Sequence, residues 1–166
     1  MRNRPKMMVP LLLATVCAGL SVAPAASAGN EDPHLVDFGT RYAAAWSSQN
    51  PAKLAAFYAE NGSLIVNGGP PSIGRAAIAD KARSFMSAFP DMVVILQRMD
   101  RNGEHPIFRW IWTGTNSGPG GTGKSVRLSG YEEWTMDASG LIAKSDGHYD
   151  EVEYQRQLKV GAQAQP

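Results

Sequence analysis

The sequence predicts an α+β fold, in which three N-terminal helices are followed by a curved antiparallel sheet. Apolar residues recur at helical spacing between residues 32 and 90, where Asp-Pro and Asn-Pro pairs mark helix starts. From residue 91 to residue 149 the pattern changes to the two-residue alternation of strands, broken by an Asn-Gly turn. Helices that come first and strands that come after them are typical of an α+β domain whose helices cover one sheet face.

Capping residues mark the first two helices. Asp32-Pro33 is an N-cap followed by proline at the first helical position, and the apolar spacing extends this helix to about Ser48. The same device at Asn50-Pro51 predicts a short second helix, in which Phe57 and Tyr58 are apolar and which Asn61-Gly62 ends.

A third helix is predicted after a short strand. Residues 63–66 are the strand candidate, and a glycine- and proline-rich loop follows at 67–71. Apolar side chains from Ile78 to Phe89 then lie at helical spacing, and Pro90 stops the helix.

Four strands are predicted in the second half, and together they can form an antiparallel meander. Asn102-Gly103 is the strongest hairpin signal, and residues 137–140 form the turn before the last strand. The expected strands are residues 92–99, 107–115, 126–136 and 141–149.

The N-terminus has the pattern of a cleavable signal peptide. Three basic residues precede an apolar run at 7–20, and Ala26-Ser27-Ala28 is the motif that signal peptidase recognises. The apolar run is shorter than the roughly 20 residues that span a bilayer, which argues against a stable membrane anchor. We therefore expect residues 1–28 to be removed from an exported protein, periplasmic or secreted. A retained anchor and a lipoprotein modified at Cys17 are the alternatives.

The rest of the 166-residue chain is long enough for one hydrophobic core and too short for two. We expect one domain over residues 29–158 and a disordered tail over residues 159–166. Cys17 is the only cysteine, so the mature protein has no disulfide. The net charge is +1 with both signs interspersed, which predicts no nucleic-acid partner and no membrane-binding face.

Residues 118–125, Gly-Pro-Gly-Gly-Thr-Gly-Lys-Ser, match the P-loop motif letter for letter. A P-loop needs a helix directly after its Lys-Ser, because the helix N-terminus holds the phosphates. Here the following residues alternate like a strand. We interpret the segment as a glycine-rich hairpin loop without a nucleotide.

A family resemblance is carried by residues 41–46, 108–115, Gly118, 140–142, Tyr149-Asp150 and Gln155. These segments resemble the SnoaL-like polyketide cyclase branch of the nuclear-transport-factor-2-like superfamily. The resemblance extends over Leu35 to Leu158, and it implies a cone-shaped fold in which the curved sheet and the helices enclose a deep apolar pocket. Members of this superfamily include isomerases, cyclases, dehydratases and epoxide hydrolases, and also binding modules, so the fold alone does not decide the function.

Glu132 and Tyr42 are the first candidate site residues. Glu132 lies on the more apolar face of its strand, where a carboxyl group needs a partner or a function. By resemblance to ketosteroid isomerase, the two residues fall on that enzyme's acidic and tyrosine oxyanion donors. That enzyme's general-base aspartate falls near Val66 or Asn67, which cannot act as bases. The alternatives are a salt bridge between Glu132 and Arg109, and simple helix packing for Tyr42.

The last strand supplies the second set of candidates. Alternation places Asp146, His148 and Asp150 on one face, and a carboxylate beside an imidazole in an apolar cavity would suit proton transfer. The family resemblance favours Asp150. The alternative is that this face is solvated and carries ordinary surface charge.

Arg109 shares a strand face with Ile107 and Ile111, which predicts a carboxylate or an anionic ligand group beside it. Epoxide hydrolases of this superfamily place an acid two residues after a similar arginine, and here Ile111 occupies that position.

Two functions are consistent with these residues. The first is a cofactor-free cyclase, isomerase or hydrolase in which Asp150 and His148 move a proton on a hydrophobic small molecule. Arg109, Glu132 and Tyr42 would stabilise the developing oxyanion. The second is a non-catalytic binding module, or one whose outer sheet face pairs two subunits. We expect a homodimer, and the scattered histidines predict no metal.

Overall fold

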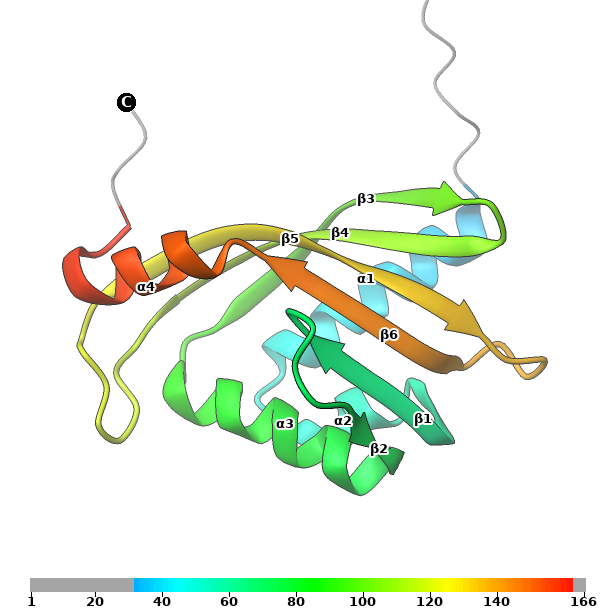
Figure 1. Ribbon diagram of the computed structural model, residues 1–166, viewed down its shortest axis with the longest axis horizontal. Helices are drawn as coiled ribbons and strands as arrows, with labels where there is room; N and C mark the ends of the chain where they lie inside the picture. The colour runs from blue at the N-terminus through cyan, green and yellow to red at the C-terminus, as the bar shows by residue number, and fades with distance from the viewer. Residues whose placement is uncertain (1–31, 163–166) are drawn as a thin grey trace, which may run out of the picture.

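The computed structural model describes residues 32–162, so the predicted signal peptide, Cys17 and residues 163–166 lie outside the described part of the chain. Three helices precede most of the sheet, as the sequence predicted: α1 (Pro33–Ser47), α2 (Pro51–Ala55) and α3 (Gly74–Ala88) (Figure 1). A fourth helix, α4 (Glu151–Val160), follows the last strand. No helix among residues 32–162 is long and apolar enough to cross a membrane.

The caps of the first two helices act as predicted. The Asp32 carboxylate accepts a hydrogen bond from the His34 N–H at 3.0 Å. The Asn50 side chain accepts from the N–H groups of Ala52 and Lys53. In both helices, proline at the first position loses no hydrogen bond, because that N–H has no partner within a helix.

Helix α2 is shorter than predicted. It ends at Ala55, and Tyr58 already belongs to the first strand. The expected stop at Asn61-Gly62 is instead an irregularity inside this strand, where the pairing register shifts. Gly62 fits there because a Cβ atom would lie 2.7 Å from the carbonyl oxygen of Ile142.

Six strands form one curved sheet, in the order β2-β1-β6-β5-β4-β3. The predicted meander of the last four strands is confirmed, because each of them pairs antiparallel with the next. Strand β1 runs parallel to β6, so the sheet becomes mixed where β1 joins the predicted antiparallel strands. The strands are β1 (Tyr58–Val66), β2 (Ser72–Ile73), β3 (Val93–Asn102), β4 (His105–Thr115), β5 (Ser125–Met136) and β6 (Ile142–Tyr149).

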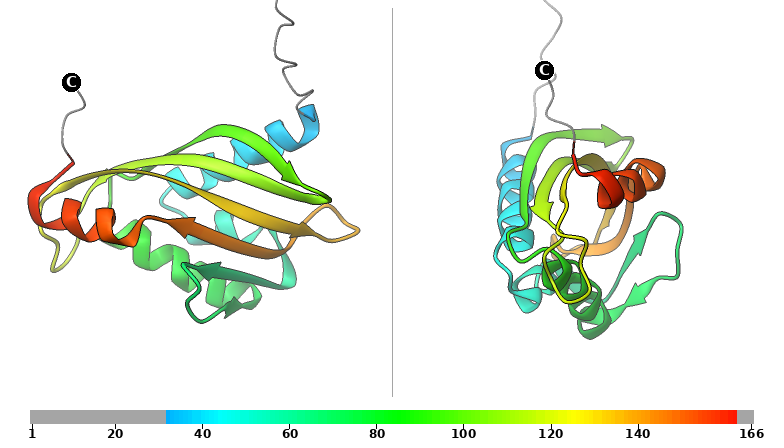
Figure 2. Two further views of the ribbon diagram at one scale, coloured as in Figure 1. Left: turned by 45° about the horizontal axis from the view of Figure 1, so that its top comes forward. Right: turned by 90° about the vertical axis from the view of Figure 1, so that its left-hand side faces the viewer.

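The sheet curls around the core, and helices α1 and α3 lie against its concave side (Figure 2). Tyr42 on α1 is fully buried and meets Trp134 and Phe108 edge-on, at ring-centre distances of 5.1 and 5.3 Å. Phe108 and Trp134 stack on each other across β4 and β5. Each such ring contributes about 1.5–3 kcal/mol by leaving water, so this aromatic cluster fixes α1 on the sheet.

The glycine-rich segment is the loop between β4 and β5, and strand β5 follows it directly. The interpretation of this segment as a hairpin loop is therefore confirmed. Its glycines allow close packing: the Gly118 N–H donates to the Ala88 carbonyl, and a Cβ at Gly118 would lie 1.9 Å from the Ser87 carbonyl oxygen. The loop thus packs on the C-terminal end of α3.

Helix α4 was not predicted from the sequence. It packs on β5 through Gln157, whose side-chain oxygen accepts from the Arg127 N–H at 2.6 Å and whose amide donates to the Arg127 carbonyl at 2.9 Å. Lys159 and Val160 belong to this helix, two residues beyond the expected end of the domain.

We predict that Gln157→Ala destabilises the protein by about 1–3 kcal/mol, because the buried Gln157 side chain is lost and two backbone groups of Arg127 lose their partners. Urea denaturation would measure this change. The control is Gln155→Ala, an exposed position on the same helix, which should change the free energy of unfolding by less than about 0.5 kcal/mol. Equal effects of the two substitutions would contradict the role of Gln157.

Candidate functional site

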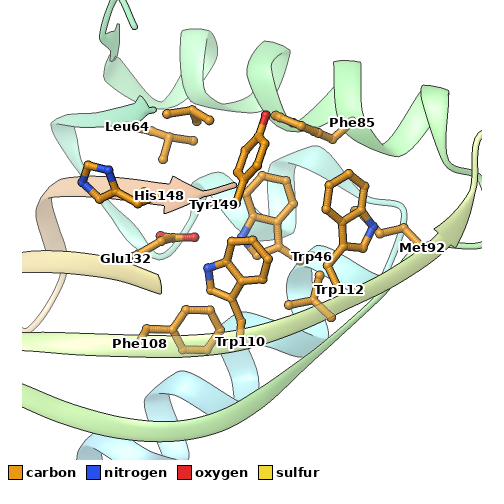
Figure 3. A pocket seen from close by; sticks show the side chains of 13 residues that line it. Trp46, Leu64, Phe85, Met92, Phe108, Trp110, Trp112, Glu132, His148 and Tyr149 are labelled. Atoms are coloured by element: carbon orange, nitrogen blue, oxygen red, sulfur yellow. The ribbon is translucent and has the colours of Figure 1, made fainter. Parts of the chain in front are cut away.

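A cavity of about 60 Å³ lies between the concave face of the sheet and the helices (Figure 3). Its lining comes from every layer of the fold and is almost entirely apolar, and Glu132 is the one carboxyl group in it. The lining residues that matter below are Trp46 from α1, Phe85 from α3, Trp110 and Trp112 from β4, Glu132 from β5 and Tyr149 from β6.

The register of the sheet turns Glu132 inward. Glu132 pairs with Phe108 on β4 and with Gly147 on β6, and it shares its face with buried Leu128 and Trp134. Gly147 leaves room for the carboxyl side chain, because a Cβ there would already touch the Glu132 Cγ at 3.4 Å. The inward orientation predicted for Glu132 is confirmed.

Three donors hold one oxygen of this carboxyl group. Oε2 of Glu132 accepts hydrogen bonds from the Tyr42 hydroxyl at 2.9 Å, the Ser145 hydroxyl at 2.6 Å and the Trp134 indole N–H at 3.1 Å. The Tyr58 hydroxyl lies 2.7 Å from that of Tyr42. Since the Tyr42 O–H donates its hydrogen bond to Glu132, the Tyr58 O–H donates to the Tyr42 oxygen and completes the network.

The other oxygen, Oε1, accepts no hydrogen bond from any of residues 32–162. Because Oε2 is occupied by three donors, a proton that Glu132 binds has its place on Oε1. Oε1 is therefore the atom of Glu132 that binds and releases the proton.

Burial dominates the electrostatics of this network. Desolvation raises the pKa of Glu132 above 4.5, although the hydrogen bonds from Ser145, Trp134 and Tyr42 oppose the rise. Burial, with the charge of Glu132, raises the pKa values of Tyr42 and Tyr58 well above 10. Both tyrosines therefore stay protonated as donors. No ion pair between Glu132 and a lysine, arginine or histidine occurs in the described part of the chain.

Sequence reasoning found Tyr42 and Glu132 but missed Tyr58, Ser145 and Trp134 as their partners. Tyr58 was assigned to a helix, and in the strand that it occupies its side chain is fully buried. Ser145 pairs with Trp134 in the register of β5 and β6. Counting back along this hairpin from its turn would have placed Ser145 on the face of Glu132.

The expectation that Asp150 faces the cavity is wrong, whereas His148 is among the residues that line it. Asp150 is exposed and caps α4, where its carboxylate accepts from the Glu153 N–H at 2.9 Å. The His148 ring stacks on Tyr131 on the outer sheet face, at a ring-centre distance of 4.9 Å, and its Nε2 lies 3.3 Å from Asp146. Figure 3 shows this ring turned away from the aromatic side chains of the cavity.

Arg109 also lies on the outer face. It forms an ion pair with Asp100 and lies over the Tyr131 ring, so the carboxylate that the sequence predicted beside it is Asp100 and not Glu132. The five predicted site residues therefore separate into two groups. Tyr42 and Glu132 meet in the core, whereas Arg109, His148 and Asp150 line a second, more open pocket beside Tyr131.

The raised pKa of Glu132 predicts a pH-dependent stability. The folded protein holds this proton more tightly than the unfolded chain, so the stability that protonated Glu132 contributes is complete below about pH 4.5. It is lost as the pH rises from the unfolded pKa to the folded pKa, at about 1.4 kcal/mol for each pH unit between them. Urea denaturation at several pH values would measure the free energies of unfolding of the unaltered protein and of Glu132→Gln. The difference between the two free energies should change with pH over this window. A difference that stays constant with pH would contradict the raised pKa.

Known proteins place this architecture in a family. No curated protein sequence matches the chain. A solved structure from Catenulispora acidiphila, described as having a ketosteroid isomerase-like fold and in complex with trimethylamine, is 19% identical with a TM-score of 0.65. The match covers 73% of this chain and 91% of that one.

A structure from Exiguobacterium sp. 255-15, described as an NTF2-like protein of unknown function, is 17% identical with a TM-score of 0.58, and the match covers 67% of this chain and 96% of that one. At these identities the two structures show the fold. The sequence profile of the SnoaL-like domain matches residues 40–145. The chain therefore belongs to the SnoaL-like domain family, as the resemblance of its sequence suggested.

Proposed function

We propose that this protein is an exported, cofactor-free enzyme that moves a proton on a small carbonyl compound, with Glu132 as the general base and acid. The free Oε1 atom of a buried carboxyl group is the observation that carries the proposal. The isomerase and cyclase reactions of this type of fold are compatible with such a step, and the signal-peptide pattern of residues 1–28 supports export.

The step needs only groups of this chain. Oε1 of ionised Glu132 takes a proton from the carbon next to a carbonyl group, and the electron pair of that C–H bond passes to the carbonyl oxygen as an enolate. Return of the proton to the same carbon gives exchange, and return to another carbon gives an isomer. A carboxyl pKa raised by burial suits this role, because a base works best when its pKa lies near the working pH.

The size of the cavity limits the substrate. An apolar cavity of about 150 Å³ holds one benzene ring. A cavity of about 60 Å³ is smaller than this, so a ligand places part of a slender chain in it and extends through its open side. This shape favours a short-chain compound over a fused-ring polyketide or a steroid. The aromatic and aliphatic lining favours a compound without a charge at its chain end.

We predict that the protein accelerates deuterium exchange at the carbons beside the carbonyl group of hexan-2-one in D₂O, as followed by proton NMR. Glu132→Gln should lower the exchange rate roughly 10²- to 10⁴-fold, because it removes the base. The rate for the unaltered protein should rise with pH through the raised pKa of Glu132, because only the ionised form takes a proton.

Asp150→Asn is the matched control, since this residue caps α4 outside the cavity, and it should leave the exchange rate within about twofold of the unaltered protein. Exchange no faster than in buffer, or equal rates for the unaltered protein and Glu132→Gln, would reject the proposal.

A second candidate function is the binding of a small amine without chemistry. The carboxyl group of Glu132 has no cationic partner among the described residues, and aromatic side chains such as Trp46 and Phe85 surround the cavity. Aromatic rings beside a carboxylate suit a tertiary ammonium ion, and the relative from Catenulispora acidiphila is described in complex with trimethylamine.

This second function predicts that trimethylammonium chloride raises the melting temperature of the protein, while tetrahydrofuran, an uncharged small molecule, does not. Glu132→Gln should abolish the effect, because the ammonium ion loses its counter-charge. If the ammonium salt raises the melting temperatures of both proteins equally, or of neither, this second function is excluded.

A further inference from the structure

Two buried hydrogen-bond donors in the cavity have no partner. The indole Nε1 atoms of Trp110 and Trp112 are shielded from solvent and donate to no atom of the described residues. The two side chains are 8% and 4% exposed, and both line the cavity. A buried N–H without an acceptor costs about 1–3 kcal/mol, so such donors are rare unless a ligand or a water pairs with them.

The two donors lie at opposite ends of the cavity. Trp110 and Trp112 are two residues apart on β4, so both point to the concave face. Figure 3 shows the indole nitrogen of Trp110 turned toward Glu132 and that of Trp112 turned toward Met92. The register agrees, because Trp110 pairs with Gly130, and Glu132 is two residues further along the same face of β5.

Gly130 makes the position of Trp110 possible. A Cβ atom at residue 130 would lie 2.3 Å from Cζ2 of the Trp110 ring and 2.4 Å from the His148 carbonyl oxygen. The indole therefore lies flat over a strand position that has no side chain. This arrangement carries the N–H of Trp110 across β5 toward the carboxyl group.

Trp134, which also lies near Glu132, differs from Trp110 and Trp112 because its indole N–H has a partner. The N–H of Trp134 already donates to Oε2 of Glu132, so it belongs to the structural network. The N–H groups of Trp110 and Trp112 are the two buried indole donors without a partner among residues 32–162, and an N–H can pair only with an acceptor. The polar ends of the cavity therefore select a compound with oxygen acceptors.

We propose that Trp110 and Trp112 are the substrate-binding donors of this cavity, and that they select a short-chain compound with a carbonyl oxygen near each end. Trp110 holds the oxygen next to Glu132, and Trp112 holds the second oxygen near Met92. A further role of Trp110 rests on the proposed function: its N–H stabilises the enolate oxygen that forms when Oε1 of Glu132 removes the neighbouring proton. The aromatic walls bind the carbon chain between the two oxygens.

Indole NMR signals test this inference directly. The chain has four tryptophans, so ¹⁵N-labelled protein should give four indole N–H signals, which Trp→Phe variants assign. We expect hexane-2,5-dione to move the signals of both Trp110 and Trp112 downfield, and hexan-2-one to move that of Trp110. Hexane, which has the same chain length and no acceptor, should move neither downfield, and the Trp134 signal should stay in place with all three.

Affinity gives the second readout. Trp110→Phe keeps an aromatic ring and removes the donor, so it should weaken hexan-2-one binding roughly 2- to 10-fold and leave hexane binding unchanged. Phe85→Leu, a substitution in the same lining on α3 that removes no donor, is the control and should affect the ketone and the hydrocarbon equally.

Two results would overturn the inference: equal indole shifts with the dione and with hexane, or a Trp110→Phe protein that discriminates ketone from hydrocarbon as the unaltered protein does. The measurements follow binding alone. A protein that shows these shifts without exchanging protons would therefore keep the two donors and lose the proposed enzyme function.

Discussion

The buried carboxyl group of Glu132 is the interaction on which the fold and the cavity both depend. Its Oε2 atom joins a helix and two strands, because the donors Tyr42, Trp134 and Ser145 come from α1, β5 and β6. A carboxyl group buried without such donors would cost more than the aromatic contacts around it could offset. The network that makes the acid tolerable in the core also leaves Oε1 as its one free atom, so structure and chemistry use the same side chain.

The alternation of strand residues separates the inside of the cone from its outside. On β4, Trp110 faces inward and Arg109 faces outward. On β6, Gly147 meets Glu132 inside, and His148 stacks on Tyr131 outside. A shift of one residue would exchange these sets, so the register of the strands keeps the Arg109 guanidinium with Asp100 and Tyr131, outside the cavity.

Local signals in the sequence predicted the parts of the fold that local physics determines. The proline caps, the Asn-Gly turn and the alternating strands identified three helices and the four-strand meander. The predicted end of the second helix was wrong, because the apolar pair Phe57-Tyr58 suits the end of a short helix and the start of a strand equally well. The site was half predicted: Glu132 follows from its apolar face, whereas the inward placing of Asp150 assumed that β6 continues to residue 150, where α4 is instead capped. No local pattern indicates the free N–H groups of Trp110 and Trp112, which only the packing reveals.

The three hydrogen bonds to one oxygen have a consequence for stereochemistry. A carboxylate on a flexible side chain can rotate and offer either oxygen from several directions, but Tyr42, Ser145 and Trp134 fix the plane of this one. Oε1 can then approach a bound molecule from one side only. Any hydrogen it removes leaves from the same molecular face to which it returns, so a double bond moved by this acid would shift suprafacially, and a prochiral carbon would lose one of its two hydrogens in preference to the other.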